Sequence, residues 1–184
     1  FSHFKRYQFQ MDLVDVQEFS TKNKGVNFLL NVIDTFTRYA FVRPLQDKSA
    51  KSVLNAFISI LNEAVEKPYM IVMDKGTEFQ NKHFSDFCKK NNIKLINPQT
   101  QTHAAYIERF NRTLQQIMYK YMTEYETNTY VNVLPELVKS YNNSIHRIIQ
   151  TTPFKAETDQ EARLNIQLLN SKRFEKIKKE KIKF

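Results

Sequence analysis

The sequence contains very little cysteine and glycine, and this scarcity excludes several classes of protein. Its 184 residues include one Cys, two Gly and four His. Cys88 alone cannot form a disulfide within the chain, and one Cys with four His leaves too few ligands for a zinc site of the usual composition. Two Gly are too few for a Walker loop or a dinucleotide-binding loop. The shortage of cysteine favours a reducing, intracellular location.

Long apolar runs are also missing. The longest stretch without charge, Leu95–Ile107, is rich in Gln, Thr and Asn, whereas a membrane span needs roughly 20 apolar residues. We therefore expect no membrane segment. The chain begins with Phe1 and shows no signal-like run, which favours an excised domain or a mature fragment over a secretory protein.

Basic residues outnumber acidic ones and gather at the carboxyl end. The chain has 28 Lys+Arg and 19 Asp+Glu, a net charge of +9, and residues 171–184 carry seven of the basic and two of the acidic residues. We predict a core domain over residues 1–170 and a basic extension over 171–184, outside the core as a solvated helix or a flexible segment. The extension either links to a further domain or attracts DNA phosphates, with Lys172 and Arg173 as candidate contacts.

The apolar pattern predicts an α/β domain, and 41% hydrophobic residues are ample for a core. Three short β-rich runs with short polar connections, including Asp34–Arg38, predict an antiparallel meander. The predicted strands are Tyr7–Val16, Asn27–Ile33, Tyr39–Pro44, Tyr69–Met73 and Lys94–Ile96. The predicted helices are Lys48–Glu66, Asn81–Asn92, Ala104–Tyr125, Tyr130–Asn143 and Asp159–Leu169, with apolar stripes that reach Val65 in the first and Tyr125 in the third. This is a mixed five-stranded sheet of order βββαβαβ, flanked by helices.

Three carboxylates stand where a charge is costly or well placed to bind a ligand. Asp12 lies in the middle of the first predicted strand, where an ionised side chain needs a metal, an ion pair or strong hydrogen bonds. Asp74 follows the fourth predicted strand, at the edge where open α/β sheets present ligands. Glu108 lies near the start of the long helix, on the polar face that also carries Asn111 and Arg112.

Carboxylates without a matching buried base favour a hard divalent cation, Mg²⁺ or Mn²⁺, and three of them suit a two-metal site. Each residue also has an ordinary explanation. Asp12 marks a strand end, Asp74 forms a turn, or Glu108 is a solvated charge in the first turn of a helix. The residues alone leave these alternatives open. We expect His103 and His146 to be structural or solvent-facing.

The first predicted strand contains a second carboxylate, Asp15. Side chains alternate across a strand, so Asp12 and Asp15, three residues apart, point to opposite faces and cannot serve one metal site. Asp15 is nearer the strand end, where a solvated charge costs little, whereas Asp12 is interior. We therefore predict that Asp12 is the ligand.

Three blocks of sequence resemble the catalytic core of retroviral-type integrases and their transposon relatives. They are Gln10–Asp12, Met73–Phe79 and Ile107–Leu114. Similar downstream patterns follow at Tyr141–Asn143, His146–Arg147 and Thr152–Phe154, so that the resemblance covers about Phe4 to Ala156. The stretch Ala104–Phe110 looks closest to the integrases of Maverick/Polinton DNA transposons, with retrotransposon integrases next.

The resemblance implies a ribonuclease H-like fold and metal-dependent 3′-end processing and strand transfer of element DNA. Carried over, Asp12, Asp74 and Glu108 would bind two Mg²⁺ or Mn²⁺ ions, and Arg109, Asn111 and Arg112 would contact DNA. It further implies a homodimer or higher oligomer and a nuclear location, and the zinc-binding amino-terminal module of the family is missing. Two alternatives stay open: a domesticated or inactive DNA-binding relative, and a ribonuclease H-like nuclease acting on RNA in hybrids.

Overall fold

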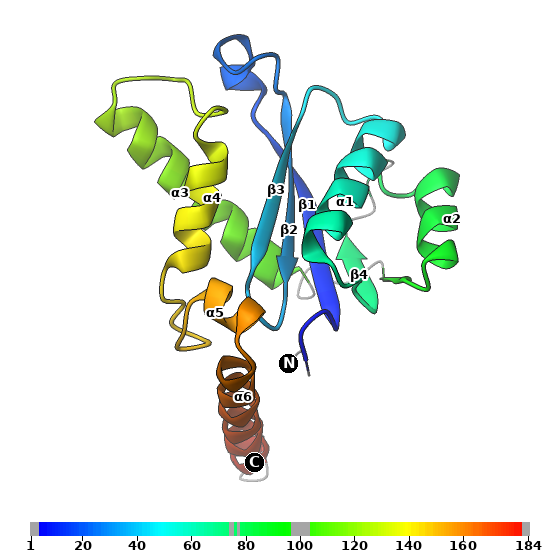
Figure 1. Cartoon of the computed structure of the whole chain (residues 1–184), viewed down its shortest axis with the longest axis vertical. Helices are drawn as coiled ribbons and strands as arrows, with labels where there is room; N and C mark the ends of the chain where they lie inside the picture. The colour runs from blue at the N-terminus through cyan, green and yellow to red at the C-terminus, as the bar shows by residue number, and fades with distance from the viewer. Residues whose placement is uncertain (1–3, 74–75, 77, 97–103, 182–184) are drawn as a thin grey trace.

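Figure 1 shows a computed structural model of the chain, which describes residues 4–73, 76, 78–96 and 104–181, with side chains as far as residue 179. Helices lie on both faces of a central sheet. Helix α1 packs on strands β2 and β3 from one side, and helices α3 and α4 pack on strands β1, β2 and β3 from the other.

The sheet of the described residues has five strands, in the order β3-β2-β1-β4-β5. Their bounds are β1 Gln8–Asp15, β2 Phe28–Asp34, β3 Ala40–Leu45, β4 Met70–Met73 and β5 Lys94–Ile96. The pairs β1–β2 and β2–β3 are antiparallel, whereas β1–β4 and β4–β5 are parallel. The predicted meander and the predicted mixed sheet are therefore confirmed.

Six α-helices and one 3₁₀ helix are described. Their bounds are η1 Gln17–Lys22, α1 Ala50–Ala64, α2 Lys82–Lys90, α3 Ala105–Glu124, α4 Leu134–Asn143, α5 Pro153–Thr158 and α6 Gln160–Lys181. The sequence pattern missed α5, which Thr152 begins by accepting a hydrogen bond from the N–H of Lys155. Helix α4 begins at Leu134, later than the predicted Tyr130, because Tyr130 is fully buried ahead of the helix in a non-helical segment.

The strand alternation of β1 divides the core into two layers. Phe9 and Met11 pack with α1, while Gln10 and Asp12 point to α3. The α3 stripe of Ile107, Phe110, Leu114, Met118 and Met122 is buried against β2 and β3. Each such side chain contributes about 1.5–3 kcal/mol to folding.

Two predicted core positions are wrong. Val65 is 87% exposed and has a φ of +64°, because it caps the end of α1 instead of continuing its stripe. Tyr125 is 63% exposed, because α3 ends one residue before it. In both cases the apolar spacing continues past the point where the helix stops.

Helix α6 runs without a break through residue 170, the predicted boundary of the core. Its early residues Ala162 and Ile166 are buried, and Ile166 packs with Phe36, Ile149 and Ala156. Beyond Ile166 its described side chains are mostly exposed, and the helix projects away from the sheet (Figure 1). Among the described helices, none is long and apolar enough to cross a membrane.

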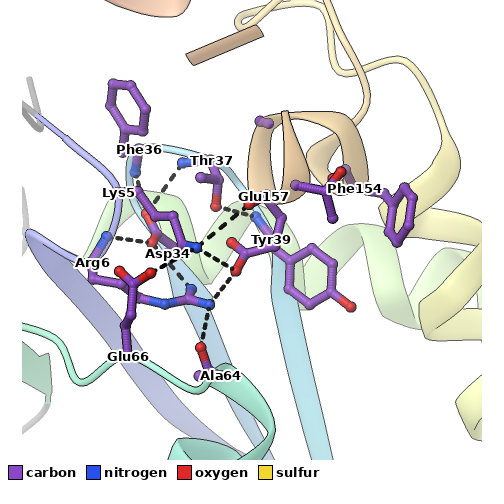
Figure 2. A network of polar contacts seen from close by, with 12 residues as sticks. Lys5, Arg6, Asp34, Phe36, Thr37, Tyr39, Ala64, Glu66, Phe154 and Glu157 are labelled. Carbon is purple, nitrogen blue, oxygen red and sulfur yellow. Dashed lines mark hydrogen bonds and ion pairs between the residues drawn. The ribbon is translucent and has the colours of Figure 1, made fainter. Parts of the chain in front are cut away.

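A buried polar network joins four segments at the end of the sheet where β2 stops and β1 begins (Figure 2). Asp34, which the sequence places in a polar connection, is the last residue of β2 and is fully buried. Its Oδ2 accepts hydrogen bonds from the backbone N–H of Arg6 (2.8 Å) and from Arg6 Nη1 (3.3 Å). Arg6 also pairs with Glu157 of α5 and donates to the carbonyl of Ala64 at the end of α1 (3.1 Å). The network thus fixes the amino-terminal segment to the β2–β3 turn and two helices.

Candidate active site

Asp12 is half-buried on β1, the central strand, and faces α3. Its Oδ1 accepts a hydrogen bond from the N–H of Leu13 (2.8 Å). Its Oδ2 accepts one from Nδ2 of Asn111 on α3 (2.7 Å). The carboxylate is thereby held in one orientation by a strand and a helix.

Asn111 is itself held by Asn31 of β2. Nδ2 of Asn31 donates to Oδ1 of Asn111 (2.8 Å), and Asn31 is the cross-strand partner of Asp12. Asn31 is fully buried, so this chain of hydrogen bonds reaches into the core. From the sequence we expected Asn111 to contact DNA, while the contacts observed within the chain are with Asp12 and Asn31.

The start of α3 is attached to the sheet by Gln10, two residues before Asp12. Its side-chain Oε1 accepts hydrogen bonds from the N–H groups of Tyr106 (3.0 Å) and Ile107 (3.1 Å). The capping residue Ala104 offers no side-chain acceptor, so Gln10 satisfies two N–H groups that the helix leaves open. Sequence reasoning missed this role, although a glutamine at a strand position alternating with apolar residues is a signal for it.

These two attachments lie on either side of Glu108. Two residues of β1, from Gln10 to Asp12, advance about 6.6 Å. The stretch of α3 from the capped N–H pair to Asn111 advances about 7 Å. Strand and helix therefore match in length over this stretch. Glu108, one turn before Asn111, is exposed on the helix that is attached to β1 at Gln10 and Asp12.

The third predicted ligand, Asp74, lies outside the described residues. Strand β4 ends at Met73, whose register partner on β1 is Met11, the residue before Asp12. No group of three His, Cys, Asp or Glu gathers among the described residues, and of the predicted triad that set contains only Asp12 and Glu108. Their carboxylate oxygens are the donors that Mg²⁺ and Mn²⁺ prefer, so the residues present fit such an ion.

Asp15, by contrast, ends β1 and is exposed. Its carboxylate accepts hydrogen bonds from the N–H and the side-chain amide of Gln17 (both 2.9 Å). Leu13, on its face of the strand, packs with the α1 layer, whereas Asp12 contacts α3. The predicted separation of the two carboxylates onto opposite faces is present.

Residues 5–103, more than half of the chain, match the family described as the integrase core domain. The chain belongs to this family. A transposon-derived protein of Caenorhabditis elegans is 36% identical to this integrase core over 142 residues, which are 77% of this chain and 50% of that protein. The Tf2-3 transposon polyprotein of Schizosaccharomyces pombe is 27% identical over 73% of this chain and 10% of the polyprotein. The integrase core thus spans half or less of the length of these relatives.

The fold of this integrase core is the ribonuclease H-like fold of retroviral integrases. The HTLV-2 integrase catalytic core domain in complex with magnesium superposes with a TM-score of 0.70 at 19% identity, over 84% of this chain and 97% of that chain. The integrase of the simian T-cell lymphotropic virus intasome superposes with a TM-score of 0.75 at 18% identity, over 85% of this chain and 56% of that chain. At these identities the likeness concerns the fold alone.

The remaining predicted site residues of the integrase core lie on two helices. Arg109 and Arg112 are exposed on α3, one and four residues after Glu108. Lys172 is exposed on α6, and Arg173 beside it is half-buried. The positions on α3 adjoin the candidate active site, whereas those on α6 belong to the projecting basic helix.

Proposed function

We propose that this chain is the catalytic core of a transposable-element DNA integrase, which processes 3′ ends and transfers strands into target DNA. The family and the transposon-derived relatives support this proposal. The observation that carries it is the double attachment of α3 to β1, through Gln10 and Asp12, on either side of Glu108.

In the proposed mechanism, Asp12, Asp74 and Glu108 would hold two Mg²⁺ or Mn²⁺ ions. Ions held there would supply the charge that activates an attacking oxygen, from water or a 3′-hydroxyl, and stabilises a leaving oxygen. The chain's own contribution is position: Asn111 orients the Asp12 carboxylate, and Gln10 fixes the first turn of α3. Arg109 and Arg112, next to Glu108, supply positive charge for the DNA backbone.

The setting of this activity is also proposed. Joining DNA to a genome requires a nuclear location, and two-ended integration favours a homodimer or a higher oligomer; the HTLV-2 core domain is known in dimeric and trimeric forms. We assign the parent element to the Maverick/Polinton type, because the block Ala104–Phe110 resembles the integrases of those transposons. The basic end of α6, with Lys172 and Arg173, adds affinity for DNA of any sequence.

The deciding experiment is strand transfer with Mg²⁺, using duplex DNA that carries the element's own ends. Asp12→Asn and Glu108→Gln should reduce joining by several orders of magnitude and leave DNA binding intact. Asp15→Asn on the same strand and Glu124→Gln at the far end of α3 are the matched controls, and they should keep most of the activity.

The alternatives appear as different outcomes of this assay. Tight DNA binding without joining by the wild-type chain would indicate a domesticated binding protein. Cleavage of RNA in hybrids, in preference to duplex DNA, would indicate a nuclease of the same fold. Loss of joining in Asp15→Asn with normal joining in Asp12→Asn would overturn the proposed site.

A further inference from the structure

A basic cavity of about 460 Å³ lies beside the candidate active site, between the start of α3, the segment after α4 and helix α6. Its lining includes four arginines and a histidine that come from distant parts of the sequence: Arg38, Arg109, Arg147, Arg173 and His146. Of the described residues that line it, none is Asp or Glu. The cavity therefore concentrates positive charge with no acidic side chain in its wall.

Arg38 is the central member of this lining. It is only 5% exposed, and its guanidinium stacks on the ring of Tyr106, with 4.0 Å from Cζ to the ring centroid. Its buried Nη1 has no hydrogen-bond partner, and the same is true of Nη1 of Arg173. A buried N–H group without an acceptor is costly, most of all when it carries charge. Two such groups at one cavity point to an acceptor supplied from outside the chain.

The nearby acidic side chain cannot serve as this acceptor. Asp34, which attracts the Arg38 guanidinium, is engaged by the backbone and side chain of Arg6 and by two N–H groups of the β2–β3 turn. His146 adds no charge of either sign near pH 7, because burial and the charge of Arg38 lower its pKa to about 4 and leave it neutral. No acidic side chain among the described lining residues neutralises the arginines of the cavity.

We propose that this cavity is a phosphate-binding site. Guanidinium groups bind phosphate oxygens in bidentate pairs, and the stacking of Arg38 on Tyr106 holds its plane ready for such a pair. The occupant is a phosphate group of the DNA backbone or of a free polyphosphate. A DNA phosphate as the occupant rests on the proposed function, because Tyr106 and Arg109 lie close to Glu108 on α3. A free polyphosphate as the occupant does not depend on the proposed function.

The first test measures binding of inorganic pyrophosphate by calorimetry, in EDTA so that no metal can hold the anion at the carboxylates. Arg109→Gln and Arg147→Gln, singly and together, replace exposed members of the lining and spare the buried Arg38. Lys120→Gln, an exposed position of α3 outside the cavity, is the matched control. We expect the double variant to weaken binding about tenfold or more and the control to leave it unchanged.

The melting temperature gives an independent readout, because pyrophosphate bound to the folded chain raises it. The rise should occur in the wild type and in Lys120→Gln, and should shrink in the double variant. The proposal is overturned if pyrophosphate does not bind the wild type, or if it binds the double variant and the wild type equally.

The second test identifies the source, by measuring duplex DNA binding over a range of salt concentrations. If a DNA phosphate occupies the cavity, the double variant reduces the slope of log K against log salt by about 0.9 for each lost contact, and pyrophosphate competes with DNA. If the slope is unchanged while pyrophosphate binding is lost, a free polyphosphate is the occupant. The second result keeps the site and removes only its link to the proposed function.

Discussion

Asn111 on α3 donates a hydrogen bond to Asp12 on β1, with 2.7 Å between Nδ2 and Oδ2. The same amide accepts a hydrogen bond from Asn31, which lies opposite Asp12 in the sheet. Both ends of the Asn111 amide are therefore committed, and its nitrogen faces the carboxylate. Groups that orient a metal-binding carboxylate commonly matter almost as much as the ligand itself.

Asn111→Ala removes this support without changing charge. We expect the rate of strand transfer to fall about 10- to 100-fold and the half-saturating Mg²⁺ concentration to rise, because the carboxylate is no longer held in one orientation. Gln115→Ala, one turn further along the same helix, is the control. An unchanged metal dependence in Asn111→Ala would show that the hydrogen bond is only structural.

Gln10→Leu tests the attachment of α3 to the strand. The substitution keeps approximate size at a position that is 1% exposed, but it leaves the N–H groups of Tyr106 and Ile107 without their acceptor. The free energy of unfolding should fall by about 1–3 kcal/mol, measured by denaturant titration. Gln10→Glu retains an acceptor and places a negative charge at a helix start, so it should lose less. Equal losses in both variants would contradict the capping role.

The buried Asp34 network predicts a larger effect on stability. Asp34→Asn removes the fully buried one of the two carboxylates that pair with the Arg6 guanidinium, the other being Glu157, which should cost about 3–5 kcal/mol in the free energy of unfolding. Glu63→Gln breaks an ion pair with Arg43 at the surface and is the matched control, with an expected cost of less than about 1 kcal/mol. Similar midpoints for the two variants in urea would show that the network adds no stability.

The sequence predicts most of this fold, because β1, α1 and α3 each place apolar residues toward a core layer at a regular spacing. The same local pattern predicts that Asp12 and Asp15 point to opposite faces of the sheet, since side chains alternate along a strand. It cannot predict that Asp34 pairs with Arg6, 28 residues away, or that Gln10 caps a helix 96 residues later. Those contacts depend on the register between elements, which no local pattern contains.

The basic cavity is another feature that only the fold reveals. From the sequence, Arg109 and Arg173 are two separate candidate DNA contacts, Arg38 ends a polar connection, and His146 is expected to be structural or solvent-facing. Packing brings all four residues to the lining of one cavity. Arginines that are far apart in the sequence are thereby gathered in one place.

His146 predicts a pH dependence. Its pKa is lowered to about 4, first by burial and then by the charge of Arg38, so the unfolded chain binds a proton more readily. Stability linked to His146 is therefore fully present above about pH 6.5 and falls as the pH drops toward 4. His146→Gln should flatten this part of the stability profile, measured by thermal melting between pH 4 and 7. His83→Gln, an exposed position of α2, should leave the profile as in the wild type.

Removal of residues 171–184 tests the basic end of α6. Among the side chains of that helix that the structure describes, Ile166 is the last buried one, so the deletion should leave the core intact and change the melting temperature little. If the segment neutralises phosphates, DNA affinity should fall for all sequences alike, and the slope of log K against log salt should decrease by about 0.9 for each lost contact.

Because Arg173 lines the cavity, the deletion should also weaken pyrophosphate binding, whereas Lys172→Gln should weaken DNA binding alone. A salt slope equal to that of the full chain would assign the segment to a linker, since a helix that touches no phosphate releases no counterions.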